Sequence, residues 1–172
     1  MKRFQKGFTL IELLVVIAVL GILAAGLLAT VDPLEQMKKG RDTMTRNTVV
    51  ELYNAVIRFN ANKGKMPWST DTDAISGCGT AGSVTAGPIG PIISSCVNGL
   101  VTMGELKSQF TSAVNAVTDK MFIFGSTEVA SVCFRPESKS IRSDPATRFI
   151  SDLTTSTCTP GATVSTCYWC AQ

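Results

Sequence analysis

The amino-acid sequence contains no histidine among its 172 residues, and this absence narrows the chemistry that is open to it. Histidine is the commonest general base in enzymes and a usual zinc ligand. The serine, lysine and aspartate residues that are present fall in no nucleophile elbow or other recognisable catalytic arrangement. We therefore expect a protein that is not an enzyme, with no catalytic residue, no metal site and no cofactor.

Two ligand-binding motifs are also missing. Asp71, Asp73 and Asp144 could contact calcium, but no run of acids has the spacing of an EF-hand loop. The glycine-rich stretch at residues 77–83 lacks the lysine of a phosphate-binding P-loop. Solvated, flexible loops are the better interpretation of both stretches.

A long apolar run near the N-terminus is the strongest positive feature. Residues 13–31 contain no charged side chain, and from Phe8 the run covers about 24 residues, or roughly 36 Å as a helix. That length crosses a hydrocarbon core of roughly 30 Å. Asp32 and Glu35 follow the run, and three basic residues precede it: Lys2, Arg3 and Lys6. The positive-inside tendency then places the N-terminus in the cytoplasm and the bulk of the chain outside.

The sequence offers two kinds of processing site. An ordinary secretory signal is cut after its apolar core, beside small residues such as those at 24–26 and Ala29. A cut between Gly7 and Phe8 would instead leave the apolar helix on the mature protein. It would also remove the three leader cations, so that the formal net charge of +3 falls to zero and gives no sign of nucleic-acid binding.

Glu12 is the one acid inside the start of the apolar run. A carboxylate in lipid is costly, so we expect it to have a partner and a function. The alternative is a lone acid that the helix dipole favours and that reaches back to the lipid headgroups.

The stretch GFTLIELLVVIAVLGILAA resembles the N-terminal signature of type IV pilins and of the pseudopilins of type II secretion. The resemblance implies that a prepilin peptidase cuts between Gly7 and Phe8 and methylates the new amine of Phe8. It also implies that Glu12, the fifth mature residue, pairs with the Phe8 amine of a neighbouring subunit. Such pairing would set the axial stagger of one helix against the next as a fibre grows.

A second helical pattern follows the apolar run. Apolar and small residues recur at steps of three and four, which marks one helix face that we expect to pack in a core: Leu34, Met37, Met44, Thr48, Leu52, Ala55 and Phe59. Pro33 either opens this stretch in its first turn or bends one long helix. The helix should end near residues 62–64, where Gly64 suits a left-handed cap and Pro67 prevents resumption.

Six cysteines follow the apolar run, and an even number in an exported segment predicts up to three disulfides: Cys78, Cys96, Cys133, Cys158, Cys167 and Cys170. Six cysteines allow 15 connectivities, and the sequence does not choose among them. The preferred hypothesis pairs Cys78 with Cys96 and ties Cys133 to one of the last three. The spacing of Cys167 and Cys170 would also suit a redox or zinc motif, but its position at the chain end favours a structural crosslink.

The remaining residues predict a small sheet preceded by a loop. Residues 69–99 read as a loop, residues 103–117 as a short helix, and residues 121–124 with 129–134 as a hairpin. Further β candidates stand at 140–142, 149–150 and 163–169. We expect an α+β fold, in which a long N-terminal helix packs on a small antiparallel sheet with disulfide-stabilised loops.

The expected organisation is a leader at 1–7, a transmembrane and assembly helix at 8–32, its amphipathic continuation at 33–62 and a globular head at 63–172. The leading hypothesis is a structural subunit of a type IV pilus-like filament, held in the inner membrane before assembly and at the cell surface afterwards. Its partners would be copies of itself, the prepilin peptidase and the membrane assembly machinery. A secretion pseudopilin, a monomeric membrane-anchored binding module and, third, an anchored enzyme are the alternatives.

Overall fold

The computed structural model describes residues 7–30, 32–69, 74–78, 90–117, 120–126, 128–149 and 167–172. The chain divides into two compact units between Gln36 and Met37. The first unit contains helix α1 (Leu10–Thr30), and helix α2 (Pro33–Lys63) begins in the first unit and continues through the second. The predicted α+β class, with an N-terminal apolar helix followed by helices and a small antiparallel sheet, is confirmed.

The start and the end of α2 follow from capping chemistry. The Asp32 side chain accepts hydrogen bonds from the amides of Leu34, at 3.1 Å, and Glu35, at 3.2 Å, so it is the N-cap residue. Pro33 therefore takes the first helical position, where its missing N–H costs nothing. Gly64, with a φ of 69°, ends the helix and donates to the Asn60 carbonyl at 2.7 Å. The predicted end at residues 62–64 is confirmed.

The four strands form one antiparallel sheet in the order β1-β2-β4-β3. The strands are β1 (Met121–Gly125), β2 (Ala130–Phe134), β3 (Thr147–Phe149) and β4 (Tyr168–Ala171). The predicted hairpin is confirmed as β1 and β2, with Ile123 opposite Val132. The last strand, β4, lies between β2 and β3, so the C-terminal segment is internal to the sheet and not at its edge.

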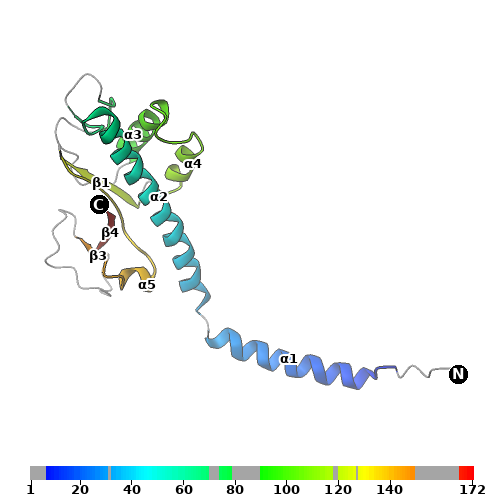
Figure 1. Ribbon diagram of the computed structural model, residues 1–172. Coiled ribbons are helices and arrows are strands. Elements are labelled where there is room, and N and C mark those ends of the chain that lie inside the picture. The colour runs from blue at the N-terminus through cyan, green and yellow to red at the C-terminus, as the bar shows by residue number, and fades with distance from the viewer. Residues whose placement is uncertain are drawn as a thin grey trace. The chain divides into compact units, whose positions relative to one another are not determined.

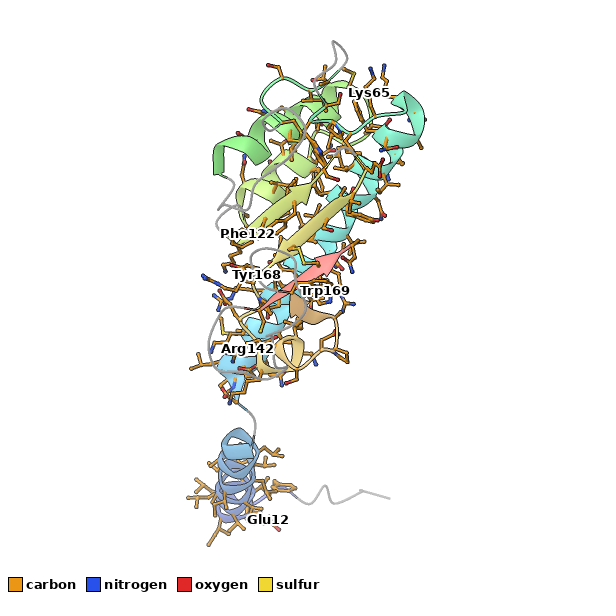
Figure 2. All side chains as sticks on the ribbon, turned by 90° about the vertical axis from the view of Figure 1, so that its left-hand side faces the viewer. Glu12, Lys65, Phe122, Arg142, Tyr168 and Trp169 are labelled. Carbon is orange, nitrogen blue, oxygen red and sulfur yellow. A yellow bond between two sulfur atoms is a disulfide. The ribbon has the colours of Figure 1, made fainter. Side chains whose placement is uncertain are left out.

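Each face of the sheet belongs to a different apolar cluster, as the period of two in a strand requires. Side chains of one face join α2, α3 and α4 in the main core: Met121, Ile123, Val132, Phe134 and Trp169. The other face carries a smaller cluster: Phe124, Cys133, Phe149 and Cys170. On that face the rings of Phe122 and Tyr168 meet edge to face at 4.8 Å between centroids (Figure 2).

Helices α3 (Gly90–Thr102) and α4 (Phe110–Asn115) lie near the C-terminal end of α2, whereas α5 (Lys139–Arg142) lies nearer its beginning (Figure 1). Near the C-terminal end of α2, the Arg58 guanidinium contacts the Glu105 carboxylate at 3.4 Å. It also donates to the carbonyl of Glu105 at 2.6 Å. The Asn62 amide donates to the same carboxylate at 2.7 Å. These contacts fix the turn after α3 against α2.

Three local expectations were wrong. Residues 90–99, predicted as loop, belong to α3, because Pro91 stands in the first turn, where a helix tolerates proline. The helix predicted at 103–117 is only α4, since Gly104, with a φ of 80°, turns the chain after α3. Residues 140–142, predicted to extend the hairpin, lie in α5, where the Ser138 hydroxyl caps the helix by accepting from the amide of Ile141.

The predicted core face of α2 is correct in its second part only. Thr48, Leu52, Ala55 and Phe59 are buried, but Leu34, Met37 and Met44 are 67%, 64% and 55% exposed. Buried residues of α2 begin at Asp42. The head therefore covers the C-terminal two thirds of this face and leaves its beginning bare.

Gly125 packs so closely against Trp68 that a glycine is needed at this position. A β-carbon at Gly125 would overlap the indole ring, whose N–H donates to the Ser126 carbonyl at 2.8 Å. Gly125→Ala is expected to lower the free energy of unfolding by about 1–3 kcal/mol, the usual cost of overpacking, in urea titrations. Gly40→Ala, in open space on α2, should instead be neutral or add up to about 1 kcal/mol. Equal stability of the two variants would contradict this.

Glu137 should make the stability of the head depend on acid. A hydrogen bond from Lys120 lowers its pKa below the ordinary 4.5, and attraction to Lys120, Arg41 and Lys38 adds to this against the opposing effect of partial burial. The stabilisation is therefore present above pH 4.5 and is lost as pH falls through the lowered pKa. Between pH 7 and pH 3, wild type should lose roughly 1 kcal/mol more than Glu137→Gln in urea titrations. Parallel profiles would refute the ion-pair contribution.

Candidate functional site

The segment that leads into α1 is held by a capping box. Residues 7–9 are not helical, and α1 begins at Leu10. The Thr9 hydroxyl accepts from the Glu12 amide at 3.3 Å, while one Glu12 oxygen accepts from the amide and the hydroxyl of Thr9 at 2.8 and 2.7 Å. This reciprocal arrangement, with the acid at the third helical position, satisfies donors that a helix start otherwise leaves open.

The capping box gives Glu12 a partner inside its own chain. Glu12 is exposed in the isolated chain and stands in the first turn of α1, where the positive end of the helix dipole favours its carboxylate. Figure 2 shows Glu12 projecting from α1. One carboxylate oxygen accepts both bonds from Thr9, and no bond from the described residues reaches the other, which can accept from a further donor.

Around Glu12 lies an open groove of about 350 Å³ lined by Phe8, Ile11, Glu12, Val15 and Val16. The lining is almost entirely apolar, and Glu12 is the one charged residue among these five. Such a surface suits an apolar neighbour that also brings one hydrogen-bond donor or cation.

The rest of α1 is apolar on every side. None of residues 7–27 is buried, and the large apolar side chains there are mostly more than half exposed, such as Leu10 at 81% and Ile22 at 75%. The helix is the one in the described chain that is long and apolar enough to cross a membrane, through residues Leu10–Leu27. Such a helix is stable only in lipid or against other apolar surfaces.

The predicted site residues fall into separate places. Gly7 and Phe8 form the non-helical approach to α1, and Glu12 lies in its first turn. In the head, one disulfide joins Cys78 to Cys96, as the preferred hypothesis had it, and another joins Cys133 to Cys170, one of the three cysteines to which that hypothesis tied Cys133. Cys167 is also disulfide-bonded, and Cys158 lies outside the described residues. The part of the chain that the structure describes contains no group of three metal-ligating side chains.

One residue of the site, Thr9, was not anticipated from the sequence. The signal was present, because Thr9-Leu10-Ile11-Glu12 has the spacing of a capping box before an apolar run.

Comparison with known proteins agrees with this geometry. Residues 2–28 match the family model described as the prokaryotic N-terminal methylation motif. The chain thus combines a type IV prepilin signature with an α+β pilin-like fold, and the resemblance to the pilins is confirmed at this level.

Among curated proteins, the chain is 33% identical over 111 residues to the fimbrial protein EcpC of Eikenella corrodens. The match covers 59% of this chain and 63% of that relative's length, which is less than two thirds of the relative. No solved structure matches the chain.

The capping box predicts a specific role for the Thr9 hydroxyl. Thr9→Val keeps the shape but removes the cap, and should destabilise the first turn of α1 by about 0.5–2 kcal/mol. Amide exchange at Leu10, Ile11 and Glu12, measured by NMR in micelles, should become faster accordingly. Thr9→Ser keeps the hydroxyl and should exchange as wild type. Unchanged exchange in Thr9→Val would show that the box does not stabilise the helix start.

Proposed function

We propose that this protein is the structural subunit of a type IV pilus-like filament, cut between Gly7 and Phe8, methylated on Phe8 and polymerised through α1. The observation that carries the proposal is helix α1. Its apolar side chains are exposed on all sides, and its first turn contains a single acid, Glu12, which is bonded to Thr9. The N-terminal methylation motif at residues 2–28 supports the same conclusion.

The position of the cut is consistent with the local backbone. The Gly7-Phe8 bond precedes the capping box, so it lies outside the hydrogen-bonded helix. A peptide bond in non-helical backbone can enter a protease active site without prior unwinding of the helix. Cleavage there removes Lys2, Arg3 and Lys6 and creates an amine one residue before Thr9.

That new amine is the cation that a neighbouring Glu12 needs. In lipid, a carboxylate is stabilised most by an opposite charge with a hydrogen bond, and the mature chain has no basic residue before Lys38. The Phe8 amine of a second subunit would occupy the open groove beside Glu12, where one carboxylate oxygen is available. One such pair per subunit would set the step between neighbours.

Lateral packing of α1 accounts for the remaining apolar surface. Removing helices from lipid into a bundle changes no apolar exposure to water, so association depends on close packing and on polar contacts. Small residues in α1, among them Gly21, Ala25 and Gly26, would allow close approach of helices. The proposed parts are the leader 1–7, the assembly helix 8–32, its continuation 33–62 and the head 63–172.

The proposed topology is a single pass through the cytoplasmic membrane, with the head outside, until the subunit joins a surface fibre. The prepilin peptidase and the membrane assembly machinery would be its transient partners. The fimbrial relative favours a surface fibre over a secretion pseudopilin.

Mass spectrometry of the protein from its native membrane tests the processing. We expect a mature chain that begins at methylated Phe8 and retains α1. A chain that begins at Met1, or one cut within residues 24–29, would contradict the proposal.

Glu12→Ala should insert and be cut normally, but electron microscopy should show at least tenfold fewer fibres, because the axial pairing is lost. Glu128→Ala, an exposed acid of the head, serves as the control and should form fibres normally. Normal fibre numbers with Glu12→Ala would disprove the pairing.

A further inference from the structure

Asp42 is a buried carboxylate on α2 that the proposed assembly does not use. Its side chain is only 3% exposed, and it is the first buried residue of α2. From Asp32 to Arg41 no residue is buried. Burial of an acid costs free energy unless donors compensate for it, so its surroundings deserve an explanation.

Three hydrogen bonds from a segment distant in the sequence compensate for the burial of the Asp42 carboxylate. The Glu137 amide donates to both oxygens at 3.0 Å, and the Ser138 amide donates to Oδ2 at 2.7 Å. These amides are 95 and 96 residues away in the sequence and immediately precede α5. Bonds to an ionised acceptor are stronger than those between neutral groups.

The same segment is held a second time by ion pairs. The Glu137 side chain contacts Arg41 at 3.0 Å and Lys120 at 2.7 Å. Arg41 and Asp42 are neighbours on α2. Residues 137–138 therefore contact α2 through the hydrogen bonds of their amides to Asp42 and through an adjacent salt bridge to Arg41. The hydrogen bonds to Asp42 are buried or partly buried, whereas the Arg41 side chain is 59% exposed, so the hydrogen bonds should contribute more than the ion pair.

On the N-terminal side of Asp42, the residues on the core face of α2 are exposed. Leu34 precedes Leu52 by about five helical turns and therefore lies on the same face. Leu52 is fully buried, but Leu34 is 67% exposed and Met37 is 64% exposed. Burial in α2 begins at Asp42, and beyond it Met44 is the one member of the predicted face that is still exposed.

We propose that Asp42 is a latch that fixes where the uncovered part of α2 ends and the part packed on the head begins. While the latch is closed, residues 33–41 can bend, unwind or pack on a new neighbour, and the rest of α2 stays packed on the head. When it is open, the uncovered part extends to Val49, the first fully buried apolar residue of α2. This role does not depend on filament formation.

Hydrogen–deuterium exchange on the full chain in detergent micelles tests the latch. In wild type, amides of residues 36–41 should exchange faster than those of residues 45–59 by roughly tenfold or more, with the step near Asp42. Asp42→Ala should raise exchange roughly ten- to a hundredfold at Glu137, at Ser138 and across residues 42–48, because it leaves buried donors without an acceptor. Residues 52–59 should be unaffected.

Three further variants separate the latch from other roles. Asp42→Asn keeps one acceptor oxygen and should give an intermediate increase; it also serves if Asp42→Ala does not fold. Arg41→Ala removes only the exposed ion pair and should change exchange less than threefold. Glu51→Ala, on the exposed side of α2, should change nothing. A wild-type chain without the step, or a rise spread evenly through the sheet in either Asp42 variant, would overturn the proposal.

Discussion

The feature on which the molecule depends is the exposed apolar surface of helix α1. Every described side chain of its apolar part is exposed. In water such a surface would drive aggregation, so the helix requires either lipid or apolar helices of other molecules. The proposed passage of the subunit from lipid into a fibre would meet this requirement at both stages.

The acid in α1 restricts how copies can pack. An apolar helix alone would pack in many registers, because lipid tails and leucine side chains are equally apolar. Glu12 adds a carboxylate that needs a partner in lipid. Thr9 bonds to one of its oxygens at the helix start, and no bond from the described residues reaches the other. The amine that the proposed cut would create is the natural complement of that oxygen.

In the head, the last strand of the chain is held inside the sheet in two ways. Strand β4, from the end of the chain, separates β2 from β3, and its Cys170 is bonded to Cys133 of β2. Main-chain pairing and the disulfide therefore act on the same two strands. In the chain-entropy description, a loop of 37 residues stabilises the fold by about 4 kcal/mol. A second disulfide, Cys78–Cys96, ties the segment after Trp68 to α3.

Much of the fold was predictable because local chemistry determined it. The apolar length of α1, the end of α2 at Gly64 and the hairpin of β1 and β2 all follow from the spacing of nearby residues. Helix α3 was missed because Gly90 and Pro91 were interpreted as loop residues, although both are acceptable at a helix start. Thr9 was missed although its motif is visible, while Asp42 has no local signal at all.

The amino-acid sequence by itself determined the membrane-length helix and the acid at Glu12, and it suggested a leader with a candidate cut at Gly7, since each depends on composition and short spacing. Only the tertiary structure decided where α2 becomes part of the head, which cysteines meet, and that the last strand is internal. Those features join residues 18 to 96 positions apart. Long-range contacts of this kind arise from packing, which leaves no periodic trace in the residues that make them.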